Sequence, residues 1–133
     1  MDWKLEVVVV PVSDVDRAKH FYSEQVGFVV DVDQQMNEHM RVVQMTPPGS
    51  ACSVTIGMGL VESLPGSMKG LQLVVADIVA ARAQLVERGV QVSEIRHVDN
   101  GVWSDGLGGD WNSFIFFDDP DGNSWAVQQS PGR

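Results

Sequence analysis

Residues 12–18 read VSDVDRA, and residues 75–81 read VADIVAA. In both stretches an apolar run leads to an aspartate, Asp14 or Asp77, and a segment with helical spacing of its apolar residues follows. Self-similarity within a chain is typical of a structural unit that has been duplicated. The sequence therefore predicts one unit that is built twice.

The first copy combines strand and helix signals in a fixed order. Residues 5–12 are rich in β-branched side chains, as a buried strand requires. Ser13 or Asp14 can cap a helix by accepting a hydrogen bond from its free N–H groups. Gly27 suits the left-handed position at the end of that helix, and a strand is expected to restart at 28–30.

The second copy repeats this order. Residues 71–75 form the expected strand, Asp77 the cap and Gly89 the end of the helix, and a further strand is predicted at 90–92. In each copy the remaining strands are separated by turns that contain proline and glycine. These strands and turns are expected at 40–45, 46–50 and 52–56 in the first copy, and at 113–117, 118–123 and 124–128 in the second.

Composition limits the classes of function. The chain has 133 residues, a formal net charge of −9 and a lone cysteine, Cys52. An acidic surface repels phosphate backbones, so we expect no nucleic-acid partner. The apolar run at 7–10 is too short for a signal peptide or a membrane span, so we expect no membrane partner. A single cysteine cannot form an internal disulfide, which favours a cytoplasmic location.

Several motifs together carry a family likeness. The stretch 12–18, followed by Phe21-Tyr22 and Gly27-Phe28, and the turn DPDGN at 119–123 resemble signatures of the vicinal oxygen chelate superfamily. This superfamily includes glyoxalases, extradiol dioxygenases, fosfomycin-resistance enzymes and bleomycin-binding proteins. The resemblance implies an α+β fold in which two tandem βαβββ modules form an incomplete barrel around a cleft. It also implies a homodimer.

The same resemblance implies one domain over residues 1–133, with module one at about 1–60 and module two at about 68–130. Metal-dependent members place His or Glu on inward strand positions, which fall here on Val7, Gly70 and Ala126, with a counterpart at about Ser53. Divalent metals prefer imidazole, carboxylate or thiolate donors, and none of these positions supplies one. We therefore expect neither a metal nor another cofactor.

Three residues are candidates for acid–base chemistry. A shift of one residue in the alignment would bring Glu6 into the first ligand position, although such a slip turns a side chain to the opposite sheet face. His39 and His97 have a side chain whose ordinary pKa, near 6.5, suits a proton carrier. Histidines in such positions are more often ordinary loop residues than functional ones.

Four residues are candidates for binding a ligand: Trp103, Trp111, Met40 and Ser53. Trp103 and Trp111 flank a glycine-rich segment that we interpret as a mobile lid over an aromatic or cationic ligand. Both indoles can instead fill the core or an interface. Met40 offers an adaptable apolar contact. Trp125, next to Ala126, is expected to face the core by strand alternation.

The favoured function is metal-free binding of a small molecule, with sequestration of an antibiotic or a metabolite as the example. The alternative is a metal-independent isomerase or lyase that uses Glu6, His39 or His97 in the same cleft. A metal-dependent glyoxalase or dioxygenase is the third hypothesis, which the missing ligands oppose.

Overall fold

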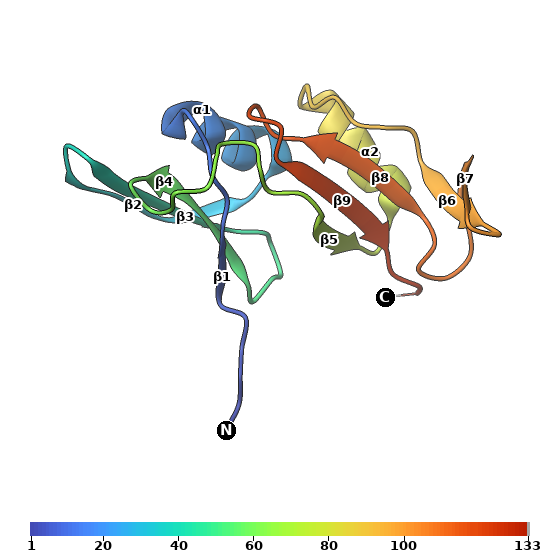
Figure 1. Ribbon diagram of the computed structural model, residues 1–133. Helices are drawn as coiled ribbons and strands as arrows, with labels where there is room; N and C mark the ends of the chain where they lie inside the picture. Colours follow the sequence, from blue (N-terminus) through green and yellow to red (C-terminus); the bar gives the residue numbers. More distant parts are fainter. Residues whose placement is uncertain (133) are drawn as a thin grey trace. The chain divides into compact units, whose positions relative to one another are not determined.

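The computed structural model describes residues 1–132 and contains two compact units (Figure 1). Unit 1 comprises residues 1–68 together with 119–123, and unit 2 comprises 69–118 together with the chain from 124 onward. The elements of unit 1 are β1 (Val7–Val9), α1 (Val15–His20), η1 (Phe21–Val26), β2 (Val29–Asn37), β3 (Met40–Thr46) and β4 (Ser53–Met58). Those of unit 2 are β5 (Leu71–Val75), α2 (Ile78–Glu87), β6 (Arg96–Asp99), β7 (Val102–Asp105), β8 (Phe114–Asp118) and β9 (Ser124–Gln129).

Unit 1 contains a four-stranded sheet, sheet 1, in the order β1-β4-β3-β2. β1 pairs in parallel with β4, whereas the other neighbours are antiparallel. One face of sheet 1 is fully buried because Val43, Met45, Val54 and Ile56 alternate onto it, each at most 6% exposed. α1 packs against β4 and adds Ala18 to this core.

The helix signals of the first copy are confirmed. Asp14, rather than Ser13, caps α1, because its carboxylate accepts a hydrogen bond of 3.0 Å from the backbone N–H of Arg17. The π-helical segment η1 continues α1, and its end at Gly27 has a φ of 98°. The N–H of Gly27 donates to the carbonyl of Tyr22 at 2.9 Å, which closes the wider π-type turn.

β1 is much shorter than the predicted strand over 5–12. Its partner strand β4 begins at Ser53, which lies opposite Val7, so the residues before Val7 have no neighbouring strand in residues 1–132. At the other end, the Pro11 carbonyl accepts from the N–H of Gly66 at 3.2 Å rather than from a strand.

Unit 2 contains a five-stranded sheet, sheet 2, in the order β5-β9-β8-β6-β7. α2 is capped as predicted: Asp77 accepts a hydrogen bond of 3.0 Å from the N–H of Ala80. The buried face of sheet 2 carries Ile115, Phe117, Trp125 and Val127, each at most 4% exposed. Trp125 is therefore a core residue, as strand alternation predicts.

The predicted strand at 90–92 is wrong. Only an isolated bridge joins Val92 to Phe117, and Ser93 then takes over the pairing. The N–H of Ser93 donates to the carbonyl of Phe116, and the N–H of Phe116 donates to the Ser93 hydroxyl, both at 2.9 Å. The side chain of Ser93 thus replaces a backbone ladder partner, and an unpredicted hairpin, β6 and β7, follows.

The fold class is confirmed as α+β with two modules of the predicted kind. The two mixed sheets do not close into a barrel. The second module carries one strand more than the first, because β6 and β7 stand where a single strand was expected.

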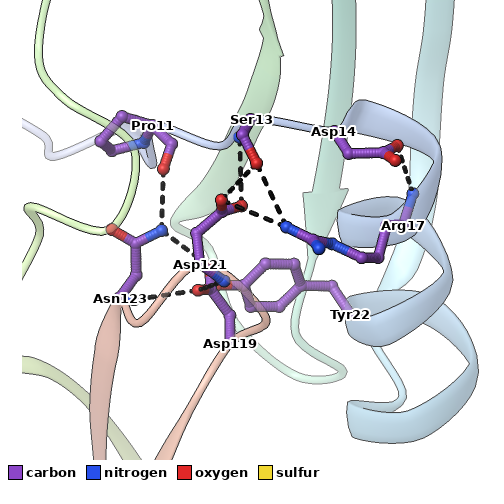
Figure 2. Close-up of polar contacts among 8 residues, drawn as sticks. All are labelled: Pro11, Ser13, Asp14, Arg17, Tyr22, Asp119, Asp121 and Asn123. Carbon is purple, nitrogen blue, oxygen red and sulfur yellow. Dashed lines mark hydrogen bonds and ion pairs between the residues drawn. The ribbon is translucent and has the colours of Figure 1, made fainter.

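The turn at 119–123 is anchored within unit 1 by side-chain hydrogen bonds (Figure 2). The buried carboxylate of Asp119 accepts hydrogen bonds from the Tyr22 hydroxyl and the Asn123 amide, each at 2.7 Å. The same amide donates to the carbonyl of Pro11 at 2.8 Å. Asp121 accepts from Ser13 and, at 3.2 Å, from Arg17. These groups satisfy one another, which indicates a structural role for the turn.

Candidate functional site

The exposed face of sheet 2 combines aromatic and amide side chains. β8 and β9 pair Phe114 with Gln128 and Phe116 with Ala126, and β5 brings Gln72 opposite Ala126. Residues that lie directly opposite each other in a sheet project on the same side. Phe114, Phe116, Gln72 and Gln128 therefore share one surface, opposite the buried face that holds Trp125.

The Trp103 ring packs perpendicular to both phenylalanine rings of this face. Its ring centroid lies 5.4 Å from that of Phe114 and 5.5 Å from that of Phe116, with an interplanar angle of 84° in both pairs. Phe114 and Phe116 are nearly parallel, at 8°, with centroids 6.3 Å apart. Edge-to-face packing of this kind is favourable and holds the indole in one orientation. Trp103 nevertheless remains 48% exposed.

Two glutamines add fixed polar groups beside the aromatic rings. The Gln72 amide donates to the side-chain carbonyl of Gln128 at 2.6 Å, and the Gln128 amide donates to the carbonyl of Trp111 at 2.7 Å. This relay places Trp111 next to Gln128, the strand partner of Phe114. The ring of Trp103 therefore contacts Phe114, and the backbone of Trp111 lies beside the strand partner of Phe114.

Hydrogen bonds join the glycine-rich segment between the two tryptophans to neighbouring residues. The N–H of Gly106 donates to the carbonyl of Ile95 at 2.8 Å, and that of Gly108 to the Ser113 hydroxyl at 3.0 Å. Trp103 itself belongs to β7. Trp111 has a φ of 60°, an uncommon conformation for a side chain of its size. Strain at a non-glycine residue is often associated with function.

Met40 and Ser53 lie in unit 1, on the face of sheet 1 opposite its core. Ser53 is only 6% exposed, and its hydroxyl is 2.7 Å from that of Thr46, which in turn donates to Asp31. Met40, which is 36% exposed, starts β3 at the opposite end of the sheet. The structure therefore does not bring these two candidates together.

Two of the three acid–base candidates, Glu6 and His39, lie far apart in unit 1. The carbonyl of Glu6 accepts from the N–H of Ser53 at the start of β4, whereas the carbonyl of His39 lies against Gly59, just past the end of β4. The six residues of β4 separate these positions by about 20 Å.

His97 lies in unit 2, on the side of β6 away from the Trp103 indole. The strand pairing sets Val98 opposite Trp103 and His97 opposite Ser104, so the side chains of His97 and Trp103 alternate onto different faces. Nδ1 of His97 lies 2.9 Å from the carbonyl oxygen of Gly106. A carbonyl only accepts hydrogen bonds, so this nitrogen carries the proton.

The sheet register allows the residues at the metal-ligand positions to be tested for fit. The repeat aligns Val9 with Gln72, and these residues pair with Thr55 and Ala126 respectively, so the counterpart of Ala126 is Thr55 rather than Ser53. Neither Val7, Gly70 nor Ala126 has a donor atom in its side chain, and Thr55 has only a hydroxyl. These residues do not fit a divalent metal. Among residues 1–132, no group of three His, Cys, Asp or Glu side chains is placed to hold one.

Unit 1 also contains an open cavity of about 520 Å³ between the segments 9–16 and 57–65. Its charged groups already have partners: Asp14 caps α1, and the Arg41 guanidinium lies 2.8 Å from Asp16. None of the candidate residues lines this cavity. No helix within residues 1–132 has the length and apolar character needed to span a membrane.

The model of the Glyoxalase/Bleomycin resistance protein/Dioxygenase superfamily matches residues 4–127. The chain belongs to this superfamily. The chain is similar to the solved structure of TnmS3, an antibiotic binding protein from Streptomyces sp. CB03234, at 35% identity over 97% of each chain with a TM-score of 0.78. It is also similar to a glyoxalase/bleomycin resistance protein from the same organism, at 36% identity over 95% of this chain and all of that one, with a TM-score of 0.75.

A third structure, a superfamily member from Sphaerobacter thermophilus DSM 20745, is 28% identical over 97% of this chain and 98% of its own, with a TM-score of 0.77. A comparison with curated protein sequences found no match.

Sequence reasoning missed Phe114, Phe116, Gln72 and Gln128. The run FIFF at 114–117 is apolar at every position, so alternation alone does not say which phenylalanines face outward. A polar residue inside the apolar strand 71–75, Gln72, was the available signal for an exposed face.

Proposed function

We propose that this superfamily member binds and sequesters a small molecule, an antibiotic or a metabolite, through the exposed face of sheet 2. The observation that carries the proposal is the half-exposed indole of Trp103, which packs perpendicular to the rings of Phe114 and Phe116 with centroid distances of 5.4 and 5.5 Å. The likeness to an antibiotic binding protein over 97% of the chain supports it. Superfamily membership alone would be compatible with many functions.

The chemistry of this face favours a flat aromatic ligand. Aromatic faces attract other rings and cations, with energies of about 0.5–2 kcal/mol each. Gln72 keeps a side-chain carbonyl oxygen that can accept a hydrogen bond from the edge of such a ligand. The net charge of −9 favours a cationic or neutral ligand over an anionic one.

Binding without turnover and without metal is part of the proposal. Glu6 and His39 stand at opposite ends of β4, and the side chain of His97 points away from the face that carries Trp103. An isomerase or lyase needs a base within hydrogen-bond reach of its substrate. The separation of Glu6 from His39 within unit 1, and the position of His97 on the other side of sheet 2 from Trp103, favour binding over turnover. The residues at the metal-ligand positions offer no metal donors.

Two tryptophan substitutions test the binding face. We expect Trp103→Ala to weaken the binding of 9-aminoacridine, a flat aromatic cation, about tenfold, since one cation–π or stacking contact is worth about 1–2 kcal/mol. The melting temperature should fall less than in Trp125→Ala, because about half of the Trp103 surface is already exposed in the folded protein. Trp125→Ala is the matched control: its 3% exposed indole belongs to the core, so its loss should cost about 3–5 kcal/mol of stability. Isothermal titration and thermal unfolding measure the two effects.

Trp111→Ala should also weaken binding, because it removes a large, 42% exposed indole whose backbone is held beside Gln128, the strand partner of Phe114. Equal affinity in wild type and both exposed-tryptophan variants would refute this face as the site. Recovery of a chemically altered ligand after incubation would instead support the isomerase or lyase alternative.

A further inference from the structure

The end of β6 is held by a side chain rather than by a strand. Within residues 1–132, β8 pairs with β6 only where Phe114 lies opposite Arg96. The same register, continued, would set Asn112 opposite Val98, but β8 begins at Phe114. The side-chain amide of Asn112 takes the place of the missing strand. Its oxygen accepts from the N–H of Val98, and its nitrogen donates to the carbonyl of Val98, each at 2.8 Å.

These two hydrogen bonds act on the hairpin that carries Trp103. β6 and β7 form the outer edge of sheet 2 (Figure 1), and Val98 stands directly opposite Trp103 within this hairpin. Residues directly opposite each other in a sheet share one face, so a shift of the Val98 backbone also moves the indole of Trp103. The Asn112 amide therefore sets how this indole lies against the rings of β8.

Asn112 also fixes the turn that carries Trp111. The backbone N–H of Asn112 donates to the carbonyl of Gly109 at 3.1 Å, which closes a turn over 109–112 with Trp111 in its third position. That position of a type II turn requires a positive φ and usually holds glycine, whereas here Trp111 adopts it with a φ of 60°. The turn is anchored on both sides, because Gln128 donates to the carbonyl of Trp111 and Asn112 binds β6.

We propose that Asn112 is a positioning residue for the ligand, a role that rests on the binding function proposed above. Its side chain fixes the hairpin that carries Trp103, and its backbone closes the turn that carries Trp111. Both indoles are thereby ordered before a ligand arrives. Side chains that become ordered only on binding cost affinity, so indoles that are already ordered bind a rigid, flat ligand more tightly.

Asn112→Leu removes both hydrogen bonds to Val98 with little change in side-chain volume. We expect this variant to bind 9-aminoacridine about threefold to tenfold more weakly than wild type in isothermal titration, the affinity that ordering of one or two side chains costs. The indoles of Trp103 and Trp111 are still present in the variant, so a loss of this size would come from their positions and not from their removal.

Two neighbouring glycines give a matched pair of variants that leave the Asn112 amide in place. A Cβ on Gly108 would lie 2.2 Å from the backbone oxygen of Asn112 and 2.7 Å from the Cβ of His97, whereas no atom lies within 4 Å of a Cβ on Gly109. Neither glycine has a φ in the left-handed region, so alanine brings no backbone strain at either position. Gly108→Ala should therefore displace Asn112 and weaken binding, and Gly109→Ala should bind as wild type does.

Fluorine NMR of protein labelled with 5-fluorotryptophan shows which indoles move, with no ligand present. The chain has four tryptophans, whose resonances can be assigned by substitution. Asn112→Leu and Gly108→Ala should shift the signals of Trp103 and Trp111. The signal of Trp125, which is buried in the core of the same sheet, should stay unchanged.

A loss of stability alone should not produce these effects. Asp77→Ala removes the N-cap of α2 elsewhere in unit 2, and it should lower the melting temperature without changing the affinity or the signals of Trp103 and Trp111. Wild-type affinity in both Asn112→Leu and Gly108→Ala, or unshifted signals of the two indoles, would overturn the positioning role while the proposed function stands. A wild type that does not bind 9-aminoacridine would instead overturn the proposed function, and the ligand role of Asn112 with it.

Discussion

At the scale of single residues, glycines mark where the backbone cannot accept a side chain. Gly66 has a φ of 81°, and a Cβ placed on it would lie 2.1 Å from the carbonyl oxygen of Asp121. Gly49 has nearly the same φ, 83°, but no atom lies within 4 Å of the corresponding Cβ position. A side chain at Gly49 would therefore introduce backbone strain alone, whereas a side chain at Gly66 would introduce both backbone strain and a close contact.

Gly66→Ala should destabilise the protein considerably more than Gly49→Ala. Both alanines would have to adopt the left-handed backbone conformation, which costs about 1–2 kcal/mol for a residue with a Cβ atom. Only Gly66→Ala also forces the turn at 119–123 away, with loss of hydrogen bonds such as that from the N–H of Met68 to Asn123. Urea unfolding of both variants measures the difference. Equal destabilisation by the two substitutions would show that the turn at 119–123 can move aside without a cost in free energy.

At the scale of elements, a charge network joins α1 to β2 and β3. The Arg41 guanidinium donates to Asp33 at 2.9 and 3.0 Å, and the Lys19 ammonium lies 2.7 Å from the same carboxylate. Hydrogen bonds from Arg41 first, and then from Lys19, hold the pKa of Asp33 well below its ordinary value. Asp33 in turn raises the pKa of Arg41. The network stabilises the contact of these three elements in its ionised form.

The contribution of Asp33 to the free energy of unfolding should therefore decrease as the pH falls. A carboxyl whose pKa is lower in the folded state binds fewer protons there than in the unfolded chain. Its stabilisation is complete above the unfolded pKa of about 4 and is lost as the pH falls below that value. The unfolding free energy of wild type should exceed that of Asp33→Asn at pH 7, and the gap should narrow below about pH 4.

Denaturant unfolding at a series of pH values measures this gap. Asp99→Asn, a change at an exposed carboxyl on β6, serves as the control. A gap that stays constant from pH 7 to pH 3 would contradict ionic stabilisation by Asp33.

At the scale of the whole molecule, the two modules share a plan but differ in chemistry. Unit 2 carries the aromatic rings and amides of its exposed sheet face, whereas the second face of sheet 1 carries Met40, Thr46 and Ser53. We propose that the aromatic face makes the principal contact with a ligand. The metal-ligand positions of both modules hold aliphatic, hydroxyl or missing side chains.

Metal analysis of the purified protein tests this last feature. Because no strong donor stands at these positions, we expect less than one equivalent of zinc, nickel, iron or manganese per chain. Removal of metal by a chelator should leave both ligand affinity and melting temperature unchanged. One tightly held ion per chain would refute the metal-free proposal.

Local interactions explain which predictions were confirmed. Asp14 and Asp77 cap their helices because an N-cap depends on only a few neighbouring residues. The strand predicted at 90–92 did not form because only one bridge joins Val92 to Phe117, and the N–H of the distant residue Phe116 then donates to the Ser93 hydroxyl in place of a backbone carbonyl. No local pattern indicates that substitution.

From the sequence alone follow the duplication, the helix caps, the family likeness and the lack of metal donors, since each depends on residue types at short spacing. The folded structure was needed to identify the surface that Trp103 shares with Phe114 and Phe116, the separation of Glu6 from His39, and the position of His97 on the other side of sheet 2 from Trp103. Strand register and pairing bring together residues that are far apart in the chain, and the choice between the two faces of an apolar strand depends on what packs against it.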